Sequence, residues 1–370
     1  MNPADAAPRP LEPIQFAASP GFCSWMAGIQ LSLALTTYQA NRLIVIGWDG
    51  QQPTMTQREF DRPMGLAVRG PEIALATQFS VILLRDDPSL AGGYRMDSPG
   101  HHDALFLPRF VYLTGAIQAH DLAFGVEGLW VVNTQFSCLA TLSPEYSFVP
   151  RWQPRFVSAL APGDRCHLNG LASIDGTPRY VTALGQSDEP GGWRARRVDG
   201  GLLIDVQTRE TVIGGLSMPH SPRWHDGRLW ALNSGAGELL AIDPTRGRGD
   251  VVCVLPGFLR GMSLHGPFAI IGMSSLRVRH LFSGLPVQER FGRLLCGVSV
   301  VDLRSGSVIG QLEFTSGCEE LYEVATLPGL DRPMLLNLGS GMARHAFATP
   351  QGSCWSERGE PATSLPIPLS

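Results

Sequence analysis

The sequence contains no lysine, because all 29 of its basic residues are arginine. A chain without lysine has no side-chain amine for a Schiff base, for pyridoxal phosphate or for a phosphate-binding loop. The GxGxxG, GxSxG and HExxH motifs are also missing. Their absence removes the usual signatures of a dinucleotide site, a hydrolase nucleophile elbow and a helical zinc site. We therefore expect no nucleotide and no pyridoxal phosphate as cofactor.

An excess of charge of either sign is missing as well, since 29 basic residues stand against 33 acidic ones, a net charge of −4. No general basic field exists to hold nucleic acid, so none is expected as a partner. The chain starts without a basic segment followed by an apolar one, and its most apolar early stretch, residues 26–48, is interrupted by polar residues. We expect no secretory signal, no membrane partner and a cytoplasmic location. The seven cysteines form no CxxC pair, which argues against a disulfide framework and a cysteine zinc site.

Glycine and proline are abundant, with 42 and 29 copies, as is typical of all-β repeat proteins. Ser19 followed by Pro20 predicts the start of one short helix that ends near Gly28. Beyond it a unit of four short strands recurs, with Gly, Asn or Pro in the gaps. The clearest copies begin at His120 and His220. Four short strands in each unit predict the blade of a β-propeller.

The inner strands of the units begin at six aligned places. These are Met64, His120, Asn169, His220, Arg260 and Glu319. They predict an all-β fold of six blades, each with four antiparallel strands, or seven blades if residues 22–26 form an inner strand instead of a helix. Strands at the two ends of the propeller are expected to share one blade and so close the ring. We expect a loose tail over residues 1–18, a single propeller domain over 19–350 and a C-terminal tail over 351–370.

Five segments resemble a bacterial family of conserved hypothetical proteins that has a domain of unknown function. The segments are TYQA at 37–40, FDRPMGLA at 60–67, DRCHLNGL at 164–171, MPHSPR at 218–223 and LPGFLRG at 255–261. The resemblance implies a propeller-like fold across nearly the whole chain. It brings no activity, cofactor or catalytic residue.

Residues at the starts of inner strands meet at one mouth of a propeller's axial channel. Here they are His120, Asp121, His167, Asn169, His220, Arg260, Glu319 and Glu320. The histidines His120, His167 and His220 allow two interpretations. They line a polar channel, satisfied by one another and by the backbone, or they share one divalent metal ion, with zinc, iron, calcium and magnesium not distinguished.

Side chains at this mouth also suit acid–base chemistry. His120 beside Asp121 is a candidate oriented base, and His220 with Glu319 or Glu320 a candidate acid pair. Arg260 and Arg223 are candidates for binding an anionic group, since guanidinium binds carboxylate or phosphate with two hydrogen bonds. The alternative is that arginines pair with acidic residues and tie blades together.

Asn169 and Glu319 complete the predicted ligand contacts. The expected function is therefore a soluble propeller that binds a small or peptide-sized polar or anionic ligand at its axial mouth. Acid–base or metal-assisted chemistry there would make it a lyase or hydrolase. The alternative is a non-catalytic scaffold that docks a protein partner, which would not require His, Asp, Glu and Arg to converge.

Overall fold

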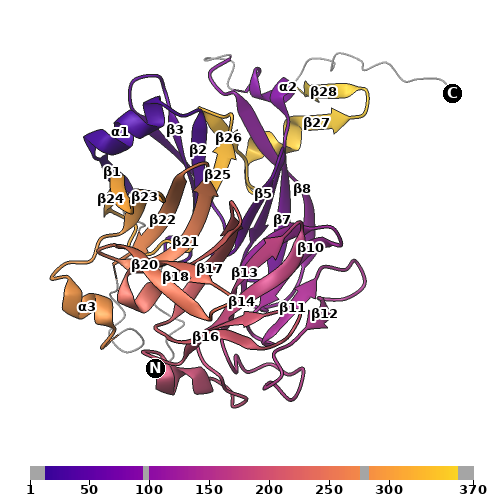
Figure 1. Cartoon of the computed structure of the whole chain (residues 1–370). Helices are drawn as coiled ribbons and strands as arrows, with labels where there is room; N and C mark the ends of the chain where they lie inside the picture. Colours follow the sequence, from indigo (N-terminus) through magenta and orange to yellow (C-terminus); the bar gives the residue numbers. More distant parts are fainter. Residues whose placement is uncertain (1–12, 95–99, 276–282, 357–370) are drawn as a thin grey trace, which may run out of the picture.

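The computed structural model describes residues 13–94, 100–275 and 283–356, and most of them lie in short antiparallel strands. Strands form because runs rich in Val, Ile, Leu and Thr are cut every few residues by Gly, Asn, Asp or Pro at turns. Six sheets follow one another around an axis, and the inner strand of each contacts the inner strand of the next until the ring closes (Figure 1). This arrangement confirms the predicted six-bladed β-propeller.

The blades are numbered from the ring closure, with their strands given from the axis outward. Blades 1 to 3 are β25 (Glu323–Pro328), β2 (Leu31–Thr37), β3 (Arg42–Trp48) and β4 (Pro53–Glu59); β5 (Leu66–Arg69), β6 (Glu72–Ala76), β7 (Ser80–Asp86) and β8 (Ala104–Leu113); and β9 (Ala119–Gly125), β10 (Gly128–Asn133), β11 (Cys138–Thr141) and β12 (Val149–Trp152). Blades 4 to 6 are β13 (Leu168–Ile174), β14 (Thr177–Ala183), β15 (Gly201–Asp205) and β16 (Thr211–Leu216); β17 (Pro219–His225), β18 (Arg228–Asn233), β19 (Glu238–Asp243) and β20 (Arg248–Val254); and β21 (Phe258–His265), β22 (Phe268–Ser274), β23 (Gly297–Asp302) and β24 (Ser307–Ser316).

Blade 1 closes the ring, because it joins strands from both ends of the propeller. Its inner strand β25 pairs antiparallel with β2 over six residues, with Leu33 opposite Thr326. In Figure 1 orange β25 accordingly lies beside indigo β2. The pairing hides two sheet edges that would otherwise be exposed, as the sequence predicted.

The short helix α1 (Pro20–Ala27) lies outside the ring, against β24 (Figure 1). The hydroxyl of Ser19 accepts a hydrogen bond from the Phe22 N–H at 3.2 Å, and Pro20 is the first helical residue. Both are the cap and first-turn features that favour a helix start. The seven-blade alternative, which needed a strand at residues 22–26, is therefore ruled out.

Parts of the two predicted tails are strands. Within 1–18, β1 (Gln15–Ala18) adds a fifth strand to blade 6 by pairing with β24. At the other end, β28 (Gly352–Trp355) pairs with β27 (Ala346–Thr349), and the Trp355 indole donates a hydrogen bond to the Leu90 carbonyl at 3.1 Å. The remaining short elements are β26 (Pro333–Leu335), parallel to β8, the helices α2 (Pro88–Ala91) and α3 (Pro286–Arg290), and the 3₁₀ helices η2 (Gly192–Arg196), η3 (Ser234–Ala236) and η4 (Gly341–His345).

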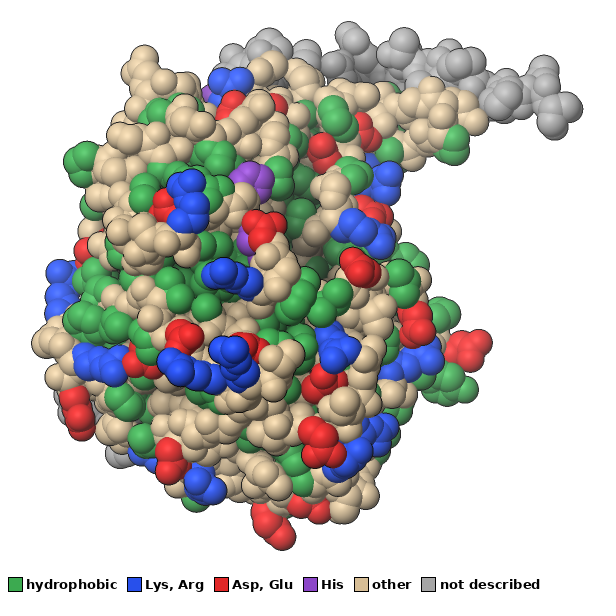
Figure 2. All heavy atoms as spheres, in the orientation of Figure 1, with side chains coloured by type: hydrophobic (Ala, Val, Ile, Leu, Met, Phe, Trp, Pro, Cys, Tyr) green, Lys and Arg blue, Asp and Glu red, His purple; other side chains and the backbone are tan. Residues whose placement is uncertain are grey.

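The hydrophobic core lies between neighbouring blades rather than at one centre. Trp130 and Trp152 of blade 3, for example, share a buried cluster with Leu168 and Val181 of blade 4. On the face shown in Figure 2, acidic and basic side chains alternate without a large patch of one charge. No helix in the described ranges is long and apolar enough to cross a membrane.

Candidate functional site at the channel mouth

Residues at the starts of the six inner strands form two successive rings around the axis. The first ring consists of Met64, His120, Asn169, His220, Arg260 and Tyr322, and the second of Gly65, Asp121, Gly170, Ser221, Gly261 and Glu323. The second ring is tight: a Cβ added at Gly261 would lie 2.7 Å from Glu323 Cα. Gly261 also has a φ of +79°, so this position requires glycine twice over.

The sixth inner strand begins later than predicted. It starts at Glu323, so Glu319 and Glu320 precede β25 instead of opening it. Near the start of β9 a polar, an acidic and an apolar residue follow one another, in the sequence His120–Asp121–Leu122. The residues at the same positions in blade 1 are Tyr322–Glu323–Val324, and not Glu319–Glu320–Leu321. The true ring residues of blade 1 are therefore Tyr322 and Glu323.

The residues of the first ring other than Asn169 line a cavity of about 570 Å³ at one end of the channel. Its volume is in the range of small-molecule sites. We call it the histidine mouth, and its principal lining residues are His120, His167, Trp193, His220, Arg260 and Tyr322. The cavity therefore brings the three predicted histidines and Arg260 together, although His120 and Arg260 are far apart in the sequence.

His120 and His220 are held in one tautomer by the backbone. The Nδ1 atom of His120 lies 2.9 Å from the Gln118 carbonyl, and that of His220 lies 2.8 Å from the Met218 carbonyl. Because a carbonyl only accepts, each Nδ1 carries the proton and each Nε2 keeps a free lone pair. Burial, with the neighbouring His167 and Arg260, lowers the pKa of His120 well below its ordinary value. Burial and Arg260 do the same for the pKa of His220, so both rings are neutral at neutral pH.

His167 is oriented by a carboxylate. Its Nδ1 lies 2.9 Å from both oxygens of Asp164, whose Oδ2 also accepts a hydrogen bond from the Trp193 indole at 3.0 Å. The rings of His167 and Trp193 pack with centroids 4.4 Å apart, and the rings of His167 and His120 with centroids 4.7 Å apart. A carboxylate on Nδ1 fixes the ring and leaves Nε2 to accept a proton, which is the arrangement of an oriented general base.

Arg260 supplies a buried positive group to the histidine mouth, whose lining also contains Arg62 and Arg194. Its Nη1 donates to Glu320 at 3.2 Å, and its guanidinium lies 3.5 Å from the centroid of the Tyr322 ring. Its Nε is buried and has no hydrogen-bond partner among the described residues, and the same holds for the Tyr322 hydroxyl. Burial raises the pKa of Tyr322, so this phenol stays protonated as a donor. Glu320 and the Tyr322 ring thus engage part of the guanidinium, and its Nε–H stays without a partner among the described residues.

The three imidazoles do not form a ready metal site. Within the described ranges, no three His, Cys, Asp or Glu side chains are grouped so that they could hold one ion. The free Nε2 atoms are the chemical type that metals bind, but their grouping favours the channel-lining interpretation. The predicted metal ion stays a prediction.

Four predicted site residues lie away from the histidine mouth. Asn169 uses its amide to donate to the Pro219 carbonyl and to accept from Thr182, which links blades 4 and 5. Glu319 lines a separate cavity beside β24. Asp121 and Arg223, predicted to act on a ligand, are instead bonded to each other inside the channel.

Arg223 is the hub of the channel. Its guanidinium pairs with Asp121 of blade 3 at 2.8 Å and with Glu323 of blade 1 at 3.1 Å. Nε donates to the Met262 carbonyl of blade 6, and Nη1 to the Leu171 carbonyl of blade 4. One side chain of blade 5 therefore binds four other blades. Holding blades together through ion pairs is the alternative role that the sequence analysis gave for the arginines.

The two carboxylates of this cluster are also tied to the backbone. Asp121 accepts from the Leu171 N–H at 3.0 Å, and Glu323 from the Met262 N–H at 3.2 Å. Burial raises the pKa of Glu323 to about 7, against the lowering effect of Arg223. Burial acts to lower the pKa of Arg223, but the two carboxylates outweigh it and raise that pKa. The arginine is therefore permanently charged.

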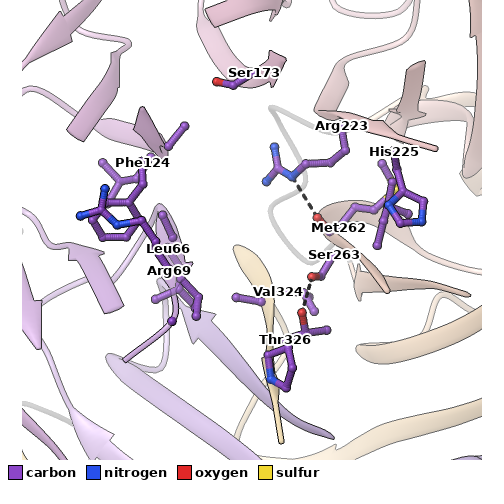
Figure 3. A pocket seen from close by; sticks show the side chains of 18 of the residues that line it. Leu66, Arg69, Phe124, Ser173, Arg223, His225, Met262, Ser263, Val324 and Thr326 are labelled. Carbon is purple, nitrogen blue, oxygen red and sulfur yellow. Dashed lines mark hydrogen bonds between the residues drawn. The ribbon is translucent and has the colours of Figure 1, made fainter. Parts of the chain in front are cut away.

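The other end of the channel holds a second cavity, of about 740 Å³, shown in Figure 3. We call it the opposite mouth, and the polar or aromatic residues among its lining include Arg69, Phe124, Ser173, His225, Ser263 and Thr326. Arg223 projects toward it, with its bond to Met262 drawn as a dashed line. Arg69 lies over the Phe124 ring at 4.3 Å, and the Ser263 and Thr326 hydroxyls are 3.1 Å apart.

Sequence reasoning missed three residues of the histidine mouth: Asp164, Trp193 and Tyr322. Asp164 stands three residues before His167, a spacing that gave a usable signal. Tyr322 was hidden by the shifted register of β25. Trp193 comes from the segment between β14 and β15, and no local pattern predicts where such a segment folds.

The closed ring and its two axial cavities place the chain in the class of six-bladed β-propellers. Residues 20–336 match the family described as "Domain of unknown function (DUF4915)", so the chain belongs to that family. The resemblance carried by the five segments is thereby confirmed. No curated protein matches the chain.

Among solved structures, a chain of the "Crystal structure of Nidogen/Laminin Complex" is similar, with a TM-score of 0.52 and 10% identity. The match covers 81% of this chain and 98% of that chain. At this identity the likeness shows the fold alone.

Proposed function

We propose that the histidine mouth binds a small anionic ligand that also carries hydroxyl or amine groups, and acts on it by acid–base chemistry of the hydrolase or lyase type. The anionic group of the ligand binds Arg260, whose guanidinium is only partly used by Glu320. Its hydroxyl or amine groups donate to the Nε2 atoms of His120 and His220, which are acceptors in their fixed tautomer.

In this proposal His167 is the base. Asp164 holds its Nδ1–H, so a proton taken from the ligand goes to Nε2, and the carboxylate stabilises the imidazolium that results. Tyr322 donates its hydroxyl proton in a hydrogen bond to the ligand, because its raised pKa keeps it protonated. Trp193 closes one side of the cavity and excludes water from the His167 ring.

One observation carries the proposal: three neutral or oriented imidazoles and a half-engaged arginine share one cavity of about 570 Å³. A scaffold for a protein partner does not need that combination. The similar propeller in the nidogen and laminin structure comes from a protein complex, but the likeness concerns the fold. Protein docking therefore remains the alternative outcome of the test.

The test is a thermal-shift screen of the full chain with hydroxycarboxylates, sugar phosphates and short acidic peptides, followed by product analysis of any hit. A ligand that binds the folded state raises the Tm. We expect Arg260→Gln to abolish the shift, and Arg69→Gln, at the opposite mouth, to preserve it. Asp164→Asn should keep binding and lose turnover. A hit that binds Arg260→Gln as well as the wild type overturns the proposal.

A further inference from the structure

Two of the buried cysteines lie next to each other at the ring closure. Cys296 directly precedes β23, and Cys318 follows β24 and precedes the inner strand β25. Their Sγ atoms are 3.9 Å apart, and both side chains are buried. A disulfide needs the sulfurs at about 2.05 Å, so they must approach by a little under 2 Å. Cys138 and Cys166 also lie near enough for one to raise the pKa of the other, but among the described residues only Cys296 and Cys318 have thiols in hydrogen-bond contact with each other.

A small molecule can reach this pair. Both cysteines line the cavity of about 450 Å³ beside β24, together with the polar residues Arg293, Glu313 and Thr315. The cavity is separate from the two mouths of the channel. Burial of the thiols therefore does not remove them from contact with an oxidant the size of hydrogen peroxide.

We propose that Cys296 and Cys318 form a modification site, at which a peroxide converts the two thiols into a disulfide that alters the histidine mouth. One thiolate attacks the peroxide, so an S–O bond forms, the O–O bond breaks and one water leaves. The second thiolate then attacks that sulfur, the S–S bond forms and the oxygen leaves as a second water. In total the two thiols lose two electrons and two protons, and the peroxide is reduced to two waters.

Cys318 is connected to the histidine mouth by the short segment 318–320. The Cys318 thiol lies 3.7 Å from the carbonyl oxygen of Glu320, to which it donates. Glu320 holds Arg260, and Tyr322 lies under the Arg260 guanidinium. Moving Cys318 toward Cys296 therefore moves the segment that positions the anion-binding arginine, an effect that rests on the proposed function.

The protonation of the pair sets its rate of oxidation. The hydrogen bond with the Cys318 thiol, together with burial, raises the pKa of Cys296 well above its ordinary value. Because the thiolate is the reactive form, oxidation should be slow at neutral pH and accelerate as the pH rises. The site is therefore expected to respond to sustained oxidant rather than to a brief pulse.

The experiment treats the full chain with hydrogen peroxide, blocks the remaining thiols with an alkylating reagent and maps the peptides by mass spectrometry. We expect one cross-linked pair of peptides, joining Cys296 to Cys318, that dithiothreitol separates. Cys318→Ser should abolish it, whereas Cys253→Ser, which removes another buried thiol, should not. Recovery of Cys296 and Cys318 as separate alkylated or sulfinic forms in the wild type overturns the modification site, and this reading does not depend on any variant folding.

Hydrogen exchange of the same samples tests the link without a ligand. Oxidation should change the exchange of the peptide covering 317–323 and leave that of β11 unchanged. If the disulfide forms and this exchange does not change, the link to the mouth is overturned while the modification site stands. If the thermal-shift screen finds no ligand, the proposed function fails, and the peptide map still decides the disulfide.

Discussion

The two ends of the axial channel hold cavities of similar size and different chemistry. The histidine mouth has an arginine, Arg260, whose guanidinium is bound by a single carboxylate, and it is lined by imidazoles whose Nδ1 atoms are held by backbone carbonyls or by Asp164. The opposite mouth has an arginine too, Arg223, but two carboxylates and two backbone carbonyls of other blades occupy it. An arginine in a propeller channel is therefore a candidate for ligand binding only when its hydrogen bonds are not already used to hold blades together.

Replacing the hub should give the largest effect. Arg223→Ala leaves Asp121 and Glu323 buried without a counter-ion, and breaking a buried ion pair in this way costs about 3–5 kcal/mol. Denaturant unfolding of the variant and the wild type measures the loss. The matched control is Arg69→Ala, because the Arg69 side chain is 57% exposed, forms its salt bridge with the partly exposed Glu72 and lies over the Phe124 ring. Its cost should stay below about 1 kcal/mol, and equal losses in the two variants would contradict the hub.

The next effect is a dependence of stability on pH that separates Glu323 from the histidines. Burial raises the pKa of Glu323 from 4.5 to about 7, so between these values the native protein holds a proton that the unfolded chain has released. Its contribution to stability is present below pH 4.5 and is lost as the pH rises through 7. His120 and His220 have lowered pKa values and act in the opposite direction, since their contribution is lost as the pH falls below their unfolded value of about 6.5.

Glu323→Gln removes only the first of these contributions. The free energy of unfolding of the wild type minus that of the variant should therefore fall by roughly 3 kcal/mol between pH 4 and pH 8, at 1.36 kcal/mol for each pKa unit. Urea unfolding at several pH values gives the two curves. The cost of placing an amide beside Arg223 is the same at every pH. It therefore changes the distance between the two curves by a constant amount and does not change how that distance varies with pH. Curves that stay parallel would show that folding does not shift the pKa of Glu323.

The fold was predictable because each blade repeats one local pattern. At five of the six inner strands the predicted start lies within two residues of the observed one, and the cap at Ser19 marks the helix. The sixth failed because Glu319–Glu320–Leu321 imitates the pattern that Tyr322–Glu323–Val324 carries three residues later. A repeated motif locates the start of a strand only when the flanking residues do not resemble the motif.

The candidate site was less predictable, because its interactions cross blades. The sequence suggested that His120, His167, His220 and Arg260 meet, and they line one cavity. It did not indicate which arginine remains available. Arg223 is engaged by Asp121, which is 102 residues away in the sequence, and by Glu323 from the ring closure. Pairing at such separations depends on side-chain reach across the axis, and no local pattern encodes that reach.

The smallest expected effect compares the two arginine–carboxylate pairs directly. The Glu320 side chain is 29% exposed and lies 3.2 Å from Arg260, whereas that of Asp121 is 2% exposed and lies 2.8 Å from Arg223. Water already solvates part of Glu320, so Glu320→Gln should lower stability by less than about 1 kcal/mol. Asp121→Asn should cost several times more, because the charge it removes balances a buried guanidinium. Unfolding of both variants under one set of conditions measures the ratio. Equal costs would place Arg260 among the residues that hold the ring together, and would remove it as the proposed anion-binding group of the histidine mouth.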